Sequence, residues 1–419
     1  MNRIVLSALC ILSVSTTLVS ATPDDVNPSI VATFSIKPPC PDDRLELPIS
    51  IEIAPLTDID PLHLKLMRVK GEELIPVIFQ VCDEETPRIF WMLDESDLRN
   101  GSISYALVNS DFKRPIPRTR VIDDGKTLTL VSGYRPFITY QYAVMQPPEG
   151  ADESYARSGF IHPLYSPHGQ VLTRIQPKDH YHHYGIWNPW PSVSYEGETV
   201  DFWHLEEKQG TVRFAGFETV CEGKVFSEFR AKQEHVVFEK DGSEKVALNE
   251  IRSVRIYRTD KDYYYADFAI QLRCAGKSPF NIQQHRYGGF SWRPTKAWKK
   301  ESTEIVTSTG KSRNNADAST AQWCMVQGEI DHDYAGAIIM SSPDNYNHPE
   351  PLRIWSDDMQ EDGDLFINFA TTRDKEWHLE PGKTYTLHYR MLVYNDRFTP
   401  DAAEAAWQSY TQPVPVKLQ

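Results

Sequence analysis

Arg252-Ser-Val-Arg-Ile-Tyr-Arg258 alternates polar and apolar side chains along its length. Residues 268–272 (Phe-Ala-Ile-Gln-Leu) repeat this pattern, as do most of residues 385–393 (Tyr-Thr-Leu-His-Tyr-Arg-Met-Leu-Val). Successive side chains of a β-strand point to opposite faces, so a period of two predicts strands with one buried face and one face in water. We therefore expect a sheet of long antiparallel strands.

Turn signals separate these segments at Lys240-Asp-Gly-Ser and Glu380-Pro-Gly-Lys. The one clear helix is near the C-terminus, where Thr399 precedes Pro400-Asp-Ala-Ala-Glu-Ala-Ala-Trp as an N-cap. A long chain with a single clear helix predicts an all-β protein with a large antiparallel β-sandwich.

The chain has 419 residues, which is more than one hydrophobic core usually supports. Short apolar stretches at residues 47–53, 74–79 and 88–93 are separated by Pro, Asp and Gly, as in a small β-sandwich. We therefore expect an N-terminal β-sandwich domain over residues 22–122 and the large sandwich over residues 123–419. Residues 111–126 look like the linker.

The N-terminus predicts export. An apolar run from Ile4 to Val19 follows Met-Asn-Arg and ends in small residues, as in a signal peptide (residues 1–21) cleaved after Ala21. We expect a secreted or periplasmic protein without membrane insertion, because this run is shorter than the roughly 20 residues that a bilayer needs. The formal net charge of -14 and the lack of a basic stripe argue against a nucleic-acid partner, and the oligomeric state stays open.

Five cysteines follow the expected signal peptide. Cys40 and Cys82 lie in the same N-terminal segment and could form one disulfide in an oxidising compartment. Cys221, Cys274 and Cys324 are far apart in strand-like sequence, which favours buried free thiols. No Cys-x-x-Cys spacing supports a cysteine metal site.

Residues 176–190 carry the densest chemical motif, Gln-Pro-Lys-Asp-His-Tyr-His-His-Tyr-Gly-Ile-Trp-Asn-Pro-Trp. In an extended segment, His180 and His182 would share one face and His183 would lie on the other. Two imidazoles on one face can bind a divalent metal ion, and one imidazole can serve as an acid or base near neutral pH. Structural histidines in a hydrogen-bonded loop are the alternative.

Other side chains of this motif favour a sugar. Asp179 could hold an imidazole in one tautomer, or simply cap a turn. Aromatic faces beside polar donors are common in sugar-binding clefts, although core packing competes for each ring. The aromatic residues concerned are Tyr181, Tyr184, Trp187 and Trp190.

Two further segments could contribute to the same site. In residues 281–293, Gly288 and Gly289 permit a bulge or a close backbone approach. His285, Arg286 and Arg293 could then meet a carboxylate or a sugar hydroxyl, unless the segment is a surface hairpin. Residues 342–349 form a Pro- and Asn-rich loop that offers His348 as a rim contact or a third metal ligand.

The sequence also resembles a bacterial family catalogued as "methane oxygenase PmoA", a domain of unknown function. The resemblance rests on residues 160–169, 173–174, 179–187, 287–290 and 341–345, in that order. Family members typically read Asp-His-Pro-His-His-Arg-Gly-Leu-Trp, and here Tyr181 replaces the Pro and Tyr184 the Arg. The name suggests a membrane oxygenase subunit, which this chain does not fit. The resemblance instead implies a supersandwich similar to galactose mutarotases and polysaccharide lyases, with matching positions at Asp179, His180, His182, His183, Gly185, Trp187, Gly288 and Gly289.

The leading hypothesis is a secreted carbohydrate-active enzyme, either a glycoside hydrolase or a polysaccharide lyase, with a His/Tyr/Arg cluster in a concave sheet. Its expected catalytic residues are His182, His183, Tyr184 and His285, and its expected substrate-binding residues are Asp179, His180, Trp187, Trp190, Arg286, Arg293 and His348. A metal-dependent enzyme that binds a divalent ion through His180, His182 and His285 is the first alternative. A non-catalytic glycan-binding module is the second.

Overall fold

The computed structural model describes residues 29–37, 45–82, 86–94, 97, 101–111, 116–259, 261–359, 363–412 and 414–418. The expected signal peptide and Cys40 lie outside these residues, so the Cys40–Cys82 disulfide stays a prediction. The described chain is almost entirely β-structure, and every described strand pair is antiparallel. The all-β prediction is therefore confirmed.

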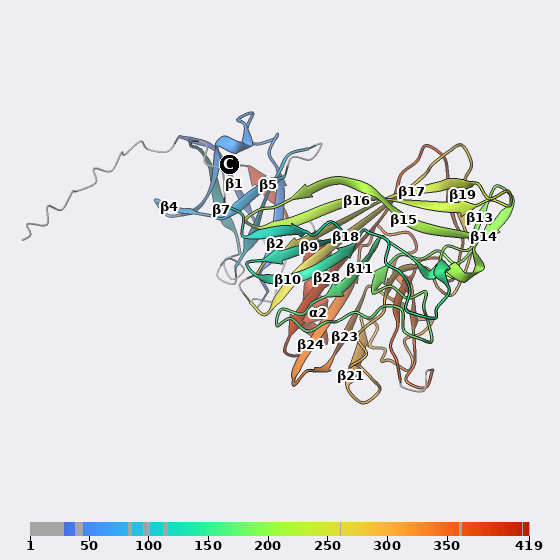
Figure 1. The fold of residues 1–419 in the computed structure, drawn as a ribbon. Coiled ribbons are helices and arrows are strands. Elements are labelled where there is room, and N and C mark those ends of the chain that lie inside the picture. Colours follow the sequence, from blue (N-terminus) through green and yellow to red (C-terminus); the bar gives the residue numbers. More distant parts are fainter. Residues whose placement is uncertain are drawn as a thin grey trace, which may run out of the picture.

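A large sandwich forms the body of the protein (Figure 1). One sheet has eight strands in the order β15 (Gly210–Cys221), β16 (Phe226–Phe238), β17 (Glu244–Tyr257), β18 (Tyr263–Cys274), β28 (Tyr385–Asn395), β24 (Asp333–Ser341), β23 (Trp323–Ile330) and β21 (Thr303–Thr307). The other has nine, in the order β22 (Thr320–Ala321), β25 (Glu350–Ile354), β26 (Ile367–Ala370), β20 (Gly289–Trp292), β12 (Ile186–Trp187), β11 (Phe160–Leu164), β10 (Arg135–Gln141), β9 (Thr127–Ser132) and β8 (Thr119–Asp123).

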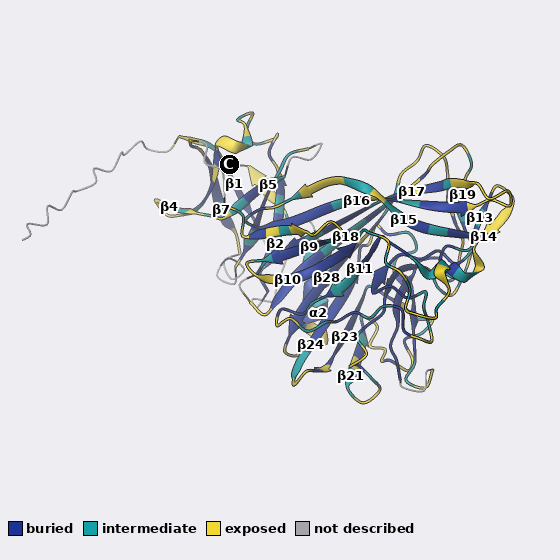
Figure 2. Ribbon diagram, viewed as in Figure 1, coloured by how far each residue is buried: buried dark blue, intermediate teal, exposed yellow. Residues whose placement is uncertain are grey.

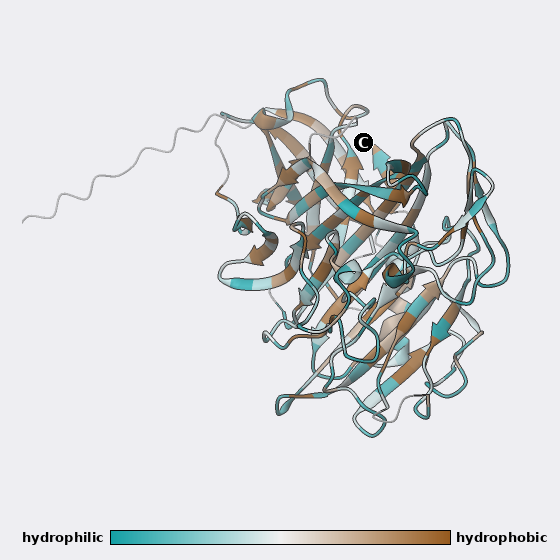
Figure 3. Cartoon of the chain, turned by 45° about the vertical axis from the view of Figure 1, so that its right-hand side comes forward, coloured by the Kyte–Doolittle hydropathy of each residue, from teal (hydrophilic) through white to brown (hydrophobic). Residues whose placement is uncertain are grey.

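The three alternating segments of the sequence are neighbours in the eight-stranded sheet. Residue Phe268 of β18 pairs with Val254 of β17 on one side and with Tyr389 of β28 on the other. These three side chains belong to the main hydrophobic core, which the two large sheets share. Figures 2 and 3 show this core as buried, mostly apolar strands, with exposed hydrophilic residues in the connecting loops.

Part of the opposite face of the eight-stranded sheet is covered, contrary to expectation, whereas Lys232, Asn249 and Arg273 on other parts of the sheet are exposed. Tyr257, Tyr265 and Leu392 belong to a second core that the sheet shares with the N-terminal strands. Whether a strand's second face is wet depends on what else packs there, and alternation alone cannot reveal that.

The N-terminal strands form two small sheets at one end of the molecule (Figure 1). One has the order β29 (Val416–Leu418), β1 (Ile30–Ile36), β7 (Ile103–Asn109), β3 (Leu64–Lys70), β4 (Glu73–Pro76), and the other β2 (Leu47–Glu52), β6 (Arg88–Leu93), β5 (Phe79–Cys82). The C-terminal strand β29 thus returns to the N-terminal part. Within the expected linker, residues 119–123 form β8 at the edge of the nine-stranded sheet.

A four-stranded sheet lies at the other end, in the order β14 (Glu198–Val200), β13 (Val193–Tyr195), β19 (Phe280–Ile282), β27 (Trp377–Leu379). The described residues also include three short 3-10 helices, namely η1 (Pro61–His63), η2 (Glu153–Tyr155) and η3 (Leu205–Glu207).

Helix α2 (Pro400–Thr411) begins where the sequence predicts, because Thr399 Oγ1 accepts a hydrogen bond from the Ala402 amide at 3.2 Å. Cys274 and Cys324 are buried free thiols, as expected, whereas Cys221 is only half-buried. Across the described residues, none of the helices has both the length and the apolar character of a bilayer span.

Candidate functional site

The histidine motif lies in the loop between β11 and β12 and is not extended. The His180 amide donates to the Pro177 carbonyl at 2.8 Å, and the His183 amide donates to the His180 carbonyl at 3.1 Å. The Gln176 amide closes the loop by donating to the His183 carbonyl at 2.7 Å. The expected alternation of faces is therefore wrong, because these turns bring His183 to the same side as the other two histidines.

The three imidazoles meet at one point. One nitrogen from each of His180, His182 and His183 lies within 4.8 Å of the other two, and we call these three residues the histidine cluster. Their ring centroids are 4.7 to 5.5 Å apart. Asp179 Oδ2 lies 2.7 Å from His180 Nδ1, which leaves Nε2 of that ring for another partner.

An aromatic box surrounds the innermost histidine. His183 is 1% exposed and contacts Trp187, Trp203, Trp355 and Phe366, with ring centroids 5.0 to 5.8 Å from its own. Its Nδ1 is buried without a hydrogen-bond partner among the described residues. A buried polar atom without a hydrogen bond lowers the stability of a protein by about 1 to 3 kcal/mol. This nitrogen is therefore a candidate for binding a ligand or an ion.

Burial keeps the cluster uncharged. It lowers the pKa of His182 to about 3 and that of His183 well below its usual value, and the neighbouring imidazoles and Arg293 add to both shifts. Burial also lowers the pKa of His180, although the Asp179 carboxylate opposes it. Neutral imidazoles of such low basicity are weak general bases at pH 7 but suitable metal ligands.

The short helix η3 and the residues before it add groups that sequence reasoning missed. Glu206 Oε1 lies 3.8 Å from His182 Nδ1, and Glu206 Oε2 is buried without a partner among the described residues. The His204 ring stands 4.7 Å from that of His182, and its Nδ1 lies 2.7 Å from Asp201 Oδ2. The sequence feature that could have revealed them is the concentration of acidic, aromatic and histidine residues at positions 201–206.

The segment of residues 285–293 does approach the cluster, as expected. Arg293 Nη2 lies 2.6 Å from Asp364 Oδ2 and 3.8 Å from Asp179 Oδ2. His285 is half-buried beside Tyr287, with its Nδ1 3.2 Å from the Tyr287 amide nitrogen. Gly289 provides the close backbone approach, since a Cβ there would lie 2.6 Å from the Phe369 carbonyl oxygen.

Several expected contact residues do not face a substrate. Arg293, Trp187 and Trp190 are buried, and Trp190 packs in the main core. Tyr184 is also buried, and its hydroxyl donates to the Tyr155 carbonyl at 2.7 Å. Fully packed side chains such as these position the loop but cannot stack on a sugar.

Two more expected residues lie apart from the cluster rings. His348 stacks on Trp407 and contacts Ser341, and among the described residues it touches no member of the histidine cluster. Arg286 is exposed, with its guanidinium 5.2 Å from the Tyr287 ring centroid. Tyr155, Tyr181 and Tyr287 are half-buried, and we call these three residues the rim of the site.

A divalent ion fits the donor set of the cluster. Ligand nitrogens at about 2.0 to 2.1 Å from a tetrahedral zinc stand roughly 3.3 Å apart, so nitrogens within 4.8 Å of one another would have to approach by up to about 1.5 Å on binding. His183 takes the place of His285 in the predicted ligand set, because the ring nitrogens that lie within 4.8 Å of one another belong to His180, His182 and His183.

Comparison with known proteins identifies a family whose function is unknown. The profile of a family of unknown function, DUF6807, matches residues 127–408, and no curated protein matches the sequence. The methane oxygenase name therefore finds no support.

Two solved structures are distantly similar to this chain. A heparan sulfate lyase HepC mutant from Pedobacter heparinus has a TM-score of 0.33 at 10% identity, over 69% of this chain and 38% of the lyase. A GalM/aldose epimerase homologue from C. elegans has a TM-score of 0.30 at 9% identity, over 67% of this chain and all of that protein. This chain thus matches well under two thirds of the lyase.

Proposed function

Because this chain belongs to the DUF6807 family, whose function is unknown, we propose its function from the site alone: a metal-dependent enzyme acting on carbohydrate. One observation carries the proposal, namely the convergence of one ring nitrogen from each of three imidazoles within 4.8 Å. In addition, the Nδ1 of His183 is buried without a hydrogen-bond partner among the described residues. A cation bound through His183 Nδ1 would satisfy this nitrogen.

Each residue has a role in this proposal. His180, His182 and His183 would hold the ion, with Asp179 fixing the tautomer of His180. Glu206, whose Oε1 lies 3.8 Å from His182 Nδ1, is the candidate fourth ligand. A bound ion of this kind supplies Lewis acidity toward a sugar oxygen or a water molecule.

The rim supports a sugar as the substrate. Tyr155 and Tyr181 stand 5.5 Å apart between ring centroids and are half-buried, and the side chain of Asp179 is 37% exposed. Aromatic faces next to carboxylates suit the C–H faces and hydroxyls of a sugar. Arg286, exposed on the same side as Tyr287, could meet a substrate carboxylate in a lyase reaction. Export through residues 1–21 remains part of the proposal.

The test is metal content followed by turnover. We expect the purified full chain, incubated with Zn, Mn, Fe, Cu or Ca and dialysed, to retain about one equivalent of one ion by elemental analysis. His180→Ala and His182→Ala should lose it, whereas His378→Ala, an exposed histidine on β27, should not. The metal-loaded protein should then turn over a member of a panel of glycosides and uronic-acid polymers, and the metal-free protein should not.

A metal-free acid–base enzyme is the second candidate, because Asp179 and His180 form a carboxylate–imidazole pair at 2.7 Å. The same experiment separates the two. Less than a stoichiometric amount of every ion, with turnover that persists in a chelator, rules out the metal centre and favours this pair.

A further inference from the structure

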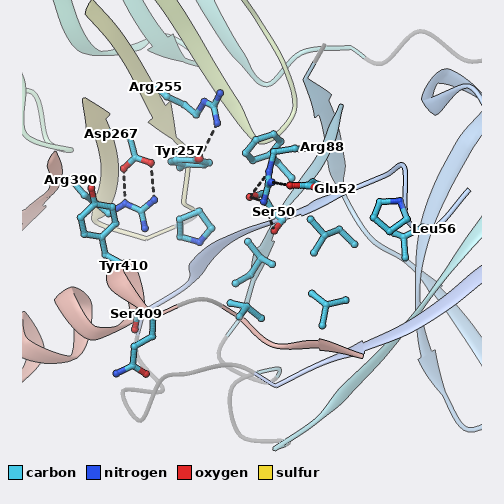
Figure 4. Close-up of a pocket in the computed structure, with 18 of the residues that line it drawn as sticks. Ser50, Glu52, Leu56, Arg88, Arg255, Tyr257, Asp267, Arg390, Ser409 and Tyr410 are labelled. Carbon is cyan, nitrogen blue, oxygen red and sulfur yellow. Dashed lines mark hydrogen bonds and ion pairs between the residues drawn. The ribbon is translucent and has the colours of Figure 1, made fainter. Parts of the chain in front are cut away.

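Two cavities away from the histidine cluster differ in how their charges are paired. The first, of about 690 Å³, lies between the N-terminal sheets and the eight-stranded sheet (Figure 4). Its arginines already have carboxylate partners: Arg390 forms two bonds with Asp267 at 2.6 and 2.7 Å, and Arg88 reaches Glu52 at 3.1 Å. Because these charges are already paired, this cavity attracts a charged ligand only weakly.

The second cavity is an open groove of about 1350 Å³ between the β9–β10 hairpin, the start of β8 and the β17–β18 turn. Its described lining carries five cationic residues and a single carboxylate. The cations are Arg118, Arg120, Arg135, Arg258 and Lys261. The carboxylate, Asp262, lies 3.2 Å from His168 Nε2. The groove is therefore cationic on a chain whose formal net charge is -14.

These cations come from three separate segments of the chain, so they do not form a continuous basic stripe in the sequence. The Arg118 and Arg135 side chains are exposed and make no hydrogen bond or ion pair with any described residue. Arg120 uses one nitrogen on the Gly133 carbonyl, at 3.2 Å. Arg258 and Lys261 have partners of their own, so the argument rests on Arg118, Arg120 and Arg135. No described carboxylate neutralises the charge of these three arginines, and this favours an anionic ligand.

The hairpin tip adds an aromatic face. Tyr134 is 98% exposed between Gly133 and Arg135, and Ile116 is 83% exposed across the groove lining. Large side chains this exposed often mark an interaction site, and a ring beside guanidinium groups suits a ligand with both flat and charged faces.

We propose that this groove binds an acidic polysaccharide, through carboxylate or sulfate groups on its sugars. The choice of a glycan rests partly on the proposed function, since nucleic acid would also meet cations. Charge density supports the choice. Duplex DNA carries one charge per roughly 1.7 Å, so the acidic protein would repel the parts of the DNA that lie outside the groove. A polymer with its charges on separate sugars would be repelled less.

The test measures binding and not turnover, so that its failure can be told from failure of the metal centre. The full-length protein is titrated with a polyuronate and with a sulfated polysaccharide at 50 mM salt. Either should bind, and the affinity of the Arg118→Ala/Arg120→Ala/Arg135→Ala variant should fall at least tenfold. A variant with Lys277, Lys296 and Lys311 changed to Ala removes the same charge elsewhere and should bind normally.

The His182→Ala variant should also bind normally, because the groove is separate from the cluster. Three results overturn the proposal: no binding by the wild type at low salt, equal affinity of the arginine variant and the wild type, or equal affinity for single-stranded DNA or anionic phospholipid vesicles. Raising salt to 200 mM should weaken glycan binding, as charge pairing requires.

Discussion

Asp364 Oδ2 accepts a hydrogen bond from the Arg293 guanidinium at 2.6 Å, although the two residues are 71 positions apart in the sequence. Arg293 is buried, and its Nε and Nη1 lack partners among the described residues. The Asp364 carboxylate is therefore the main counter-charge of this arginine, which stands between β20 and the histidine loop.

Removing that carboxylate should be costly. Asp364→Ala would leave the buried Arg293 charge with only the Asp179 carboxylate, 3.8 Å away. We expect a loss near the lower end of about 3 to 5 kcal/mol in the free energy of unfolding. Arg293→Met should cost less, because it removes the charge itself while Asp364 keeps Arg174 at 2.6 Å. Urea unfolding of both variants decides the order. A smaller loss for Asp364→Ala than for Arg293→Met would contradict this account.

Metal binding should stabilise the folded chain. A ligand that binds only the native state, at a hundredfold excess over its dissociation constant, adds about 2.7 kcal/mol. We expect the melting temperature to rise by several degrees with the preferred ion and to fall back when a chelator is added.

The His182→Ala variant should show no rise, while His378→Ala should behave like the wild type. The proposed centre is excluded if no ion changes the melting temperature of the wild-type protein.

The long strands could be predicted from sequence because their pattern is local. Residues 252–258, 268–272 and 385–393 each alternate, and they are adjacent in one sheet. The density of histidines at 180–183 also singled out the site. What could not be predicted is the turn that brings His183 beside His180, because it depends on backbone hydrogen bonds. Trp355 and Asp364 likewise reach the site only through tertiary pairing.

Gly185 shows how tightly the loop is built. Its φ of 63° is left-handed, and a Cβ there would lie 2.2 Å from the Ile161 carbonyl oxygen in β11. Gly185→Ala should therefore combine backbone strain of about 1 to 2 kcal/mol with a steric clash of about 1 to 3 kcal/mol.

Gly169→Ala is the matched control, since its φ is 95° but a Cβ would meet nothing within 4 Å. Thermal unfolding should show Gly185→Ala as the less stable of the two variants. Equal stability of the two variants would mean that β11 moves away from the added Cβ at little cost in stability.

His168 should make stability depend on pH. Its Nδ1 lies 2.7 Å from Asp333 Oδ2, and this hydrogen bond raises the pKa of His168 despite partial burial. A histidine whose folded pKa is raised stabilises the protein fully below its unfolded pKa of about 6.5, and that contribution disappears as pH rises through the folded pKa. The contribution should stay below about 1 kcal/mol, because the side chain is 41% exposed and solvent screens the pair.

His168→Gln should therefore lower stability more at pH 5.5 than at pH 8.5. Asp333 stays ionised over this range, because the hydrogen bond with His168 lowers the pKa of Asp333. His332→Gln, at an exposed histidine in the turn before Asp333, is the matched control. If His168→Gln costs as much at pH 8.5 as at pH 5.5, the pairing with Asp333 contributes by packing and not by charge, because only a charged imidazole makes the contribution depend on pH.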